Sequence, residues 1–468
     1  MTPTDENLFE VDTIMLRAKE AQNKFEQNGC QDIYDRAAFA AGWAIIEPKR
    51  NEALAKLAVK TTGLGNVADK ITKNHRKTLG LLRDIKGAAT HGVIAHDIPS
   101  GITEIARPLG VIGAVVPSTN PAATPANNVI NALKCGNAIV LAPSPKGTET
   151  CSLLLKYIHA EFDKIGLSRD LVQMLPVPGS KAKTQRMMEL SDLIVVTGSQ
   201  DNVRRGYSSG RPSLGVGAGN ATVIIDETAD LADAAAKISA SKTFDNATSC
   251  SSENAVICVD AVYDKFTEAL TNSGGAIVSN ERQVIAELWS NGTLNRGVIA
   301  QDADKMIEAL NLQETVPAST KFLVVETQGV GPDHPLSGEK LSRVLALYRA
   351  SDFEHAVKKA SEILSYQGAG HSVGLHSTDD SRAISLGHHL PTCRVIVNQA
   401  HCFATGGSFD NGMPFSLSMG CGSWGGNSIA ENLNWRHFFQ TTKIVRPIEA
   451  RIPPLDDIFE DYWSVVGR

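Results

Sequence analysis

The sequence lacks the features that place a protein in a membrane or on a nucleic acid. Its longest apolar stretch near the front, Gly110–Val116, is far too short to span a bilayer. The first ten residues are acidic and polar, so no signal peptide is visible. A net charge of −6 gives no electrostatic reason to expect a nucleic acid or an anionic membrane as a partner.

Disulfide and zinc frameworks are missing as well. Eight cysteines in 468 residues are a low density, and no two of them form a Cys-x-x-Cys pair. The twelve histidines show no zinc-like spacing with these cysteines, so we expect no metal site. A reducing cytoplasm is the simplest setting, in which most cysteines are structural and a thiol nucleophile survives.

The chain is long enough for two to four folded units, and its pattern changes near residue 110. Before that point, apolar residues recur at helical spacing over residues 8–60 and on to about Lys86. Residues 90–106 indicate short extended segments, and we predict a protruding hairpin there. After Trp435 the tail is rich in charge and proline, which is typical of an arm that docks on another surface.

From Gly110 onward, strand patterns alternate with helical patterns. Such alternation predicts open parallel sheets with helices on both faces, and therefore an α/β fold. The predicted strands form a first series at 111–116, 138–141, 171–174, 192–196 and 222–225, and a second series at 255–259, 321–325, 344–348, 373–376 and 394–398.

Cys250 is the strongest candidate for a reactive residue. It lies between a predicted helix and a predicted strand, among small polar residues, in the sequence TFDNATSCSSEN at 243–254. This setting suits a reachable sulfur better than a core sulfur. Cys421 is the rival thiol, but its glycine-rich, Trp-flanked surroundings favour a structural role. If Cys250 is a nucleophile, the chain forms a thiohemiacetal or a thioester.

Polar loops follow several predicted strands, each with an ordinary turn as its alternative. The side-chain amide of Asn120 is suited to stabilise an oxyanion, or Asn120 is a turn former before proline. Thr197-Gly198-Ser199 joins a strand to a helix, where free backbone N–H groups bind phosphate, or it is a tight turn. Gly215-Val-Gly-Ala-Gly-Asn220 precedes a strand, so it fails as a dinucleotide fingerprint. Lys146 meets a ribose 2′-phosphate or is solvated.

Three stretches together resemble the aldehyde dehydrogenase superfamily, in its CoA-acylating branch: SKTFDNATSCSSE at 241–253, GVGAGN at 215–220 and GCGSWGGNS at 420–428. The resemblance runs from about residue 105 to residue 432. It implies two doubly wound parallel-sheet domains with a small oligomerisation arm. The implied parts are a nicotinamide-cofactor domain at 1–242 with the hairpin at 90–106, a catalytic domain at 243–431 and an oligomerisation tail at 432–468.

The resemblance also implies a role for each matching residue. Cys250 matches the family nucleophile, and Asn120 matches the amide that stabilises the oxyanion together with the Cys250 backbone N–H. Glu339 matches the glutamate that holds the nicotinamide ribose. The implied cofactor contacts are Ser144, Lys146, Thr197, Gly198, Ser199, Gly215, Val216, Gly217 and Glu339. The aldehyde pocket is expected to include Thr119, Arg211, Ser249, Ser251 and His401, and Arg394 is a further candidate for an anionic head group.

One position departs from the hydrolytic members of this superfamily. Those members have a glutamate that activates water, and the matching position here is Gly215. Loss of a general base costs a factor of roughly 10²–10⁴ in the step that it assists. Water is therefore expected to be a poor acceptor for an acyl group on Cys250. A thiol such as CoA ionises far more easily than water and attacks without that residue.

The expected activity is the reversible oxidation of a short polar aldehyde to its acyl-CoA, with NADP or NAD. Several stretches resemble acylating dehydrogenases of charged aldehydes, so sulfoacetaldehyde is preferred over succinate semialdehyde and acetaldehyde. Two rival functions stay open: a reductase of acyl phosphates, and a structural, filament-forming module without turnover of its own. The arm and the tail indicate a homodimer or homotetramer.

Overall fold

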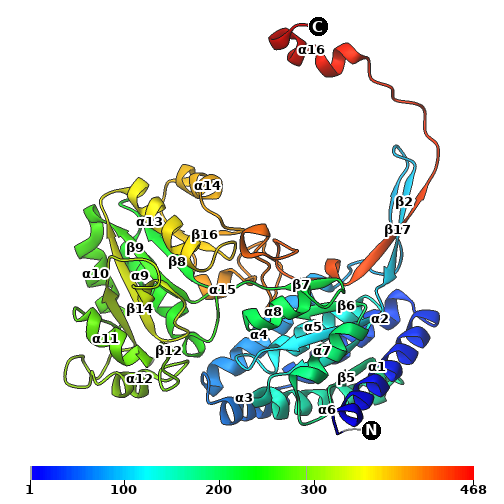
Figure 1. The fold of residues 1–468 in the computed structure, drawn as a ribbon, viewed down its shortest axis with the longest axis horizontal. Coiled ribbons are helices and arrows are strands. Elements are labelled where there is room, and N and C mark those ends of the chain that lie inside the picture. The colour runs from blue at the N-terminus through cyan, green and yellow to red at the C-terminus, as the bar shows by residue number, and fades with distance from the viewer. Residues whose placement is uncertain (1–2, 291) are drawn as a thin grey trace.

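The computed structural model describes residues 3–290 and 292–468, and it contains two parallel sheets and an extended arm (Figure 1). Met1 and Thr2, at the start of the acidic segment in which we saw no signal peptide, lie outside the described residues, as does Asn291. Within the described ranges, no helix combines the length and apolar character needed to cross a membrane.

A five-stranded parallel sheet in the order β5-β4-β3-β6-β7 forms the centre of the first unit. Every residue of β3 is buried, as expected for a parallel strand with helices on both faces. The elements of this unit are α1 (Pro3–Gln27), α2 (Gln31–Ile46), α3 (Pro48–Thr62), α4 (Val67–Ile85), β3 (Val111–Val116), α5 (Ala123–Lys134), β4 (Ala138–Pro143), α6 (Thr148–Ile165), β5 (Val172–Met174), α7 (Lys181–Leu190), β6 (Leu193–Val196), α8 (Gln200–Tyr207) and β7 (Ser213–Gly215).

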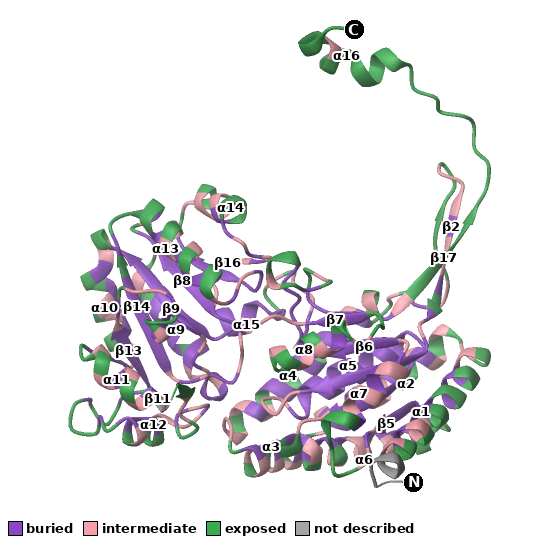
Figure 2. Cartoon of the chain, viewed as in Figure 1, coloured by how far each residue is buried: buried purple, intermediate pink, exposed green. Residues whose placement is uncertain are grey.

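A seven-stranded parallel sheet in the order β10-β13-β14-β9-β8-β15-β16 forms the second unit. Apolar clusters cover both of its faces, and the strands are buried throughout its middle (Figure 2). Its elements are β8 (Ala221–Ile225), α9 (Leu231–Thr243), β9 (Glu253–Val259), α10 (Tyr263–Asn272), β10 (Gly275–Val278), α11 (Glu281–Leu288), β11 (Trp289–Ser290), β12 (Thr293–Leu294), α12 (Ala303–Ala309), β13 (Phe322–Glu326), β14 (Val344–Ala350), α13 (Phe353–Tyr366), β15 (Val373–His376), α14 (Asp380–His389), β16 (Val395–Val397) and α15 (His401–Ala404).

The predicted α/β class and parallel sheets are confirmed, and the predicted strands are present with small shifts at their ends. We expected the first domain to run to residue 242. Strand β8 lies before that boundary, but it belongs to the second sheet, where it pairs with β9 and β15. The chain crosses between the sheets in the glycine-rich stretch 215–220. A strand pattern does not reveal which sheet the strand joins, and this explains the difference. Strands β7 and β10 were not predicted.

The predicted hairpin is present as β1 (Gly92–Asp97) and β2 (Ile102–Pro108), which pair antiparallel. Strand β17 (Phe439–Val445) adds to β2 and makes a three-stranded arm that projects from the first unit (Figure 1). Beyond it the chain extends to α16 (Leu455–Val466), which stands away from both units. Apolar side chains of this helix are exposed, among them Leu455, Ile458 and Tyr462.

Candidate active site

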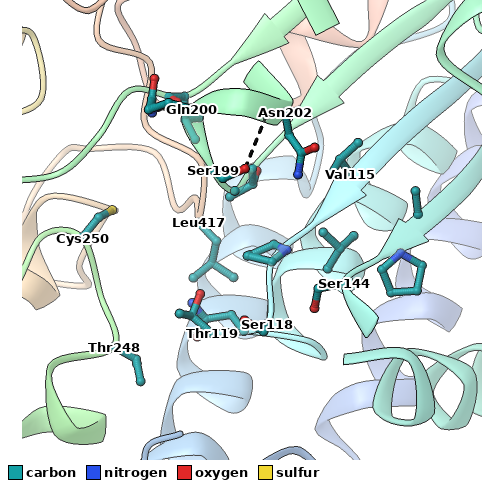
Figure 3. Close-up of a pocket in the computed structure, with 18 of the residues that line it drawn as sticks. Val115, Ser118, Thr119, Ser144, Ser199, Gln200, Asn202, Thr248, Cys250 and Leu417 are labelled. Atoms are coloured by element: carbon teal, nitrogen blue, oxygen red, sulfur yellow. Dashed lines mark hydrogen bonds between the residues drawn. The ribbon is translucent and has the colours of Figure 1, made fainter. Parts of the chain in front are cut away.

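A cleft of about 790 Å³ separates the two units, and residues from both line it. It lies at the carboxyl ends of β3, β4 and β6, where a doubly wound sheet offers its loops to a ligand. Figure 3 shows Cys250 on one wall and Ser144 and Ser199 on the opposite one, with Leu417 between them. The predicted site residues that line the cleft are Thr119, Asn120, Ser144, Thr197, Gly198, Ser199, Val216, Gly217, Ser249, Cys250, Ser251 and Glu339.

The thiol of Cys250 has an imidazole as its neighbour. His371 Nε2 lies 3.3 Å from Cys250 Sγ, and His371 Nδ1 lies 2.7 Å from Ser372 Oγ. In the tautomer that leaves Nε2 free to take the thiol proton, Nδ1–H donates to the Ser372 hydroxyl. The main chain of His371 is held in turn, because Arg394 Nη1 donates to its carbonyl at 2.9 Å. This arrangement of base, orienting group and thiol is that of an activated nucleophile.

Both partners are neutral in the cleft as it stands. Burial raises the pKa of the Cys250 thiol to about 12, and the carboxyl of Glu339 acts in the same direction. Burial lowers the pKa of His371 to about 3, and the charge of Arg394 adds to this. The imidazole is therefore in its basic form at every physiological pH. His371 can therefore take the thiol proton only as the sulfur adds to a carbonyl carbon, because a base with so low a pKa does not remove the proton from a free thiol with so high a pKa.

The loop that carries Cys250 has a left-handed backbone. Asp245, Asn246 and Ala247 have φ values of 47°, 55° and 59°, and none of them is glycine. Each such residue costs about 1–2 kcal/mol, so the surrounding structure must hold this turn. Asp245 is fully buried and binds two lysines of α4: Lys70 Nζ at 3.0 Å and Lys73 Nζ at 2.5 Å.

Lys73 also connects this turn to Asn120, the oxyanion candidate. Lys73 Nζ donates to Asn120 Oδ1 at 3.0 Å and to Thr248 Oγ1 at 2.9 Å. With its oxygen engaged by a cation, the Asn120 amide has its Nδ2 donor left for a substrate oxyanion. The backbone N–H of Cys250 faces the sulfur and lowers the thiol pKa, against the effect of burial. Asn120 Nδ2 and the Cys250 N–H are thus the two candidate donors for a carbonyl oxygen bound beside the sulfur.

The other half of the cleft fits a dinucleotide. Ser199 caps α8, since its Oγ accepts from Asn202 N at 3.4 Å (Figure 3), and the free N–H groups of that helix end suit a phosphate. Among the described residues, Ser144 Oγ and Glu339 Oε1 are buried without a hydrogen-bond partner. Such unpaired polar atoms suit hydroxyl groups of ribose. Burial raises the pKa of Glu339 to about 8.

Four predicted site residues do not line the cleft. Arg211 is exposed, and its Nε donates to Glu189 O at 2.8 Å, so it does not meet a substrate beside Cys250. Lys146 is exposed outside the cleft wall as well. His401 is buried below the wall, where its Nδ1 is 2.9 Å from Ser251 O.

Gly215 is the fourth predicted site residue that does not line the cleft. It belongs to β7 and faces α8. A Cβ at this position would lie 2.6 Å from Val203 and 3.1 Å from Tyr207. Its backbone N–H donates to Tyr207 Oη at 3.1 Å. The space that a side chain would need at Gly215 is therefore occupied by α8.

The two other groups weighed from the sequence are also engaged. Cys421 is fully buried, outside the cleft wall, and burial raises the pKa of its thiol to about 11. The Arg394 guanidinium donates to Asn432 Oδ1 and to three backbone carbonyls, at 2.9–3.1 Å. It has a structural role rather than a free charge for a substrate.

Sequence reasoning missed several residues in and around the site. His371 lies far along the chain from Cys250, and no local pattern marks it. Lys73 and Lys77 belong to α4, whose lysines resemble an ordinary solvated helix face. Lys181 and Arg205 line the cofactor half of the cleft from α7 and α8, where we had expected Lys146 to serve.

The comparison with known proteins agrees with this geometry. The family model "Aldehyde dehydrogenase family" matches residues 4–283, more than half of the chain. The chain belongs to the aldehyde dehydrogenase family. This aldehyde dehydrogenase is 55% identical to an acylating sulfoacetaldehyde dehydrogenase of Cupriavidus necator, over 98% of the chain and 93% of the relative. It is 34% identical to an acetylating succinate-semialdehyde dehydrogenase of Clostridium kluyveri, over 97% and 99%.

A solved structure has the same fold as this aldehyde dehydrogenase. An acetylating aldehyde dehydrogenase from Geobacillus thermoglucosidasius superimposes with a TM-score of 0.91 at 31% identity, over 96% of this chain and 99% of that one. The expected aldehyde dehydrogenase-like fold is therefore confirmed over nearly the whole length.

Proposed function

We propose that the chain is a CoA-acylating aldehyde dehydrogenase that converts sulfoacetaldehyde to sulfoacetyl-CoA with NADP or NAD. The observation that carries this proposal is the contact between Cys250 Sγ and His371 Nε2, at 3.3 Å in the wall of a cofactor-sized cleft. The choice of substrate is supported by the 55% identity to a relative named for this aldehyde.

The first half of the reaction forms an acyl group on the protein. His371 takes the proton of Cys250, and the sulfur adds to the aldehyde carbon. Asn120 Nδ2 and the Cys250 N–H stabilise the resulting oxyanion. A bound nicotinamide cofactor supplies the acceptor for the hydride. Loss of this hydride from the thiohemiacetal leaves a thioester on Cys250.

The second half passes the acyl group to CoA. His371 first releases the Cys250 proton to solvent, which is the proton of the net reaction. The CoA thiol then gives its proton to His371 and attacks the thioester, and Cys250 departs as the thiolate and takes this proton back from His371. One aldehyde, one CoA and one oxidised cofactor thus give one acyl-CoA, one reduced cofactor and one proton. Water competes poorly, because position 215 has no carboxylate to activate it and α8 fills the adjacent space.

The cofactor half of the cleft supports the nicotinamide cofactor. Ser144 and Glu339 offer unpaired oxygens to the ribose hydroxyls, and the start of α8 offers backbone N–H groups to the pyrophosphate. Lys181 and Arg205 add positive charge to the same wall. This charge favours the 2′-phosphate of NADP over NAD.

We propose a homodimer or homotetramer in a reducing cytoplasm. The three-stranded arm and α16 expose apolar side chains, among them Val93, Val445 and Leu455, which supports a second copy as their partner. All eight cysteines are free thiols in the structure, which supports a reducing compartment.

The test is a panel of sulfoacetaldehyde, succinate semialdehyde and acetaldehyde, each with NADP and NAD, with and without CoA. We expect reduced cofactor and acyl-CoA to appear together, fastest with sulfoacetaldehyde, and Cys250→Ser to abolish both. Cys421→Ser is the matched control and should retain activity. Turnover with phosphate in place of CoA would identify a reductase of acyl phosphates. The absence of turnover with all aldehydes would favour a structural module.

A further inference from the structure

A small side chamber adjoins the cleft beside the nucleophile loop. Its volume is about 30 Å³, and it shares Lys77, Asn120, Ser249, Cys402 and Leu417 with the wall of the cleft. A space of this size admits roughly two water molecules, since a cavity needs about 10–15 Å³ of accessible volume to hold one. A larger group must therefore lie at the junction between chamber and cleft, next to the oxyanion candidate Asn120.

Helix α4 lines this chamber with three cations, Lys73, Arg76 and Lys77. The charge of Lys73 is compensated, because its Nζ binds Asp245 at 2.5 Å. Lys77 differs: its side chain is buried, and its Nζ donates only to the carbonyls of Gly406 and Gly407, at 2.6 and 3.5 Å. In the described part of the chain, no carboxylate oxygen lies within ion-pair distance of this ammonium group.

Arg76 is the second basic side chain, and in the described residues no carboxylate oxygen lies within ion-pair distance of it, although Asp410 acts on it from further away. Its guanidinium donates to Ser408 Oγ at 2.7 Å and to Phe403 O at 3.4 Å, both of them neutral acceptors. It also lies over the rings of Phe403 and Phe415, 5.1 and 5.6 Å from their centroids. Ser408 Oγ in turn donates to the carboxylate of Asp410, so these contacts fix the plane of the guanidinium and offset its charge only from a distance.

Two basic side chains without an ion-pair partner beside an active site indicate a place for an anion. Burial lowers the pKa of Lys77 to about 7, so its ammonium group is only partly charged near neutral pH, and an anion beside it would restore the full charge. A buried charge is costly unless it is paired, so a protein that keeps one at its active site gains from an anionic ligand there. No carboxylate is among the titratable neighbours of Lys77, which are Arg76, Lys73 and the thiols of Cys402 and Cys250, and Arg76 has Asp410 only beyond ion-pair distance.

We propose that Lys77 and Arg76 bind the anionic head group of the aldehyde, and that this head group is a sulfonate. The proposal rests on the function proposed above and names the residues that select its substrate. One methylene separates the sulfur from the carbonyl carbon in sulfoacetaldehyde, a distance of roughly 3 Å. The head group must then lie directly beside the oxyanion site, and the chamber meets this demand because Asn120 and Ser249 belong to both cavities.

A sulfonate also matches the number of donors. It presents three acceptor oxygens, which suit the ammonium of Lys77 and the planar fork of Arg76 together. A carboxylate offers two oxygens, and succinate semialdehyde carries it one carbon further from the aldehyde. A neutral aldehyde leaves both cations unpaired, so it forgoes this binding energy.

The decisive variants are Lys77→Met, which keeps the volume and removes the charge, and Arg76→Gln. We expect each to lower kcat/KM for sulfoacetaldehyde by about 10–100-fold, since a hydrogen bond to a charged group is worth about 1.5–3 kcal/mol. For acetaldehyde we expect a change of less than threefold. Lys183→Met is the control, because Lys183 is equally buried but contacts Glu10 and the carbonyl of Pro176.

Sodium ethanesulfonate gives a second measurement that does not need turnover. It should raise the Tm of the wild-type protein and of Lys183→Met, and it should not stabilise Lys77→Met. Equal loss of activity on both aldehydes, or equal stabilisation of all variants, would overturn the assignment of the head-group site. A wild-type protein that acylates CoA from acetaldehyde but not from sulfoacetaldehyde would instead refute the proposed substrate.

Discussion

The imidazole of His371 offers the sharpest test of the proposed chemistry. His371→Ala removes the base that lies 3.3 Å from the Cys250 sulfur and leaves the thiol in the same buried surroundings. The thiol must then ionise on its own. Because burial raises its pKa to about 12, only a minute fraction is thiolate near neutral pH.

The size of the effect follows from the role of the base. A positioned general base contributes roughly 10²–10⁴-fold, which corresponds to about 3–5 kcal/mol of activation free energy. We therefore expect His371→Ala to form the thioester at least 100-fold more slowly. The variant should gain about tenfold for each pH unit up to pH 9, since the thiolate fraction of a group with so high a pKa grows in that proportion.

The wild-type protein should show a much flatter profile. The pKa of His371 is lowered to about 3, so its imidazole stays unprotonated and able to accept a proton across pH 5–9. A rise in pH should therefore increase the rate of thioester formation in the variant and change the rate of the wild type little.

Two measurements separate this effect from simple misfolding. The first is the rate at which iodoacetamide alkylates Cys250, followed by peptide mass spectrometry between pH 6 and 9. The second is the single-turnover yield of reduced cofactor without CoA. His376→Ala is the control, because His376 is a buried imidazole at the end of β15 that does not line the cleft. Alkylation of His371→Ala within threefold of the wild-type rate, with the same pH profile, would refute the role of His371.

Three further outcomes are expected. Asn120→Ala should lower kcat by about 10²–10³-fold, with only a small change in KM, as stopped-flow and steady-state kinetics would show, because the oxyanion loses one of its donors. Asp245→Ala should lower the free energy of unfolding by about 3–5 kcal/mol in calorimetry, because it leaves Lys73 buried without its carboxylate; a fall below 1 kcal/mol would contradict the role of this pair. Gly215→Glu should not create CoA-independent turnover, since Val203 blocks the new side chain; steady reduced-cofactor release without CoA would show otherwise.

Local sequence signals predicted much of the fold. Strands such as 111–116 and 373–376 lie where apolar runs placed them, because a parallel strand buried on both faces leaves a strong local pattern. The loop of Cys250 was found for a similar reason, since small polar residues around a thiol form a local signal. The hairpin at 90–106 and the tail were also recognised from composition and spacing.

The contacts between distant segments could not be predicted in this way. The partner of Cys250 lies two residues before β15, and its position depends on how seven strands are ordered in the second sheet. The same applies to β8, whose sequence fits either sheet. Sequence reasoning also chose the wrong basic residues for the cleft. Arg211 and Lys146 lie beside strands of the first sheet but do not line the cleft. The basic residues of α4 reach it instead, from a helix that precedes the sheet in the chain.

The spacing of the lysines on α4 has a consequence for changing the substrate of this enzyme. Lys70, Lys73 and Lys77 are three and four positions apart, so they share one face of the helix. The first two hold the turn before the nucleophile, and the third lies one helical turn further along at the side chamber. The residues that we assign to substrate selectivity and those that hold the catalytic turn thus lie on neighbouring segments of a single helix. A library restricted to positions 76 and 77 should therefore sample new aldehydes while the turn that presents the thiol stays intact.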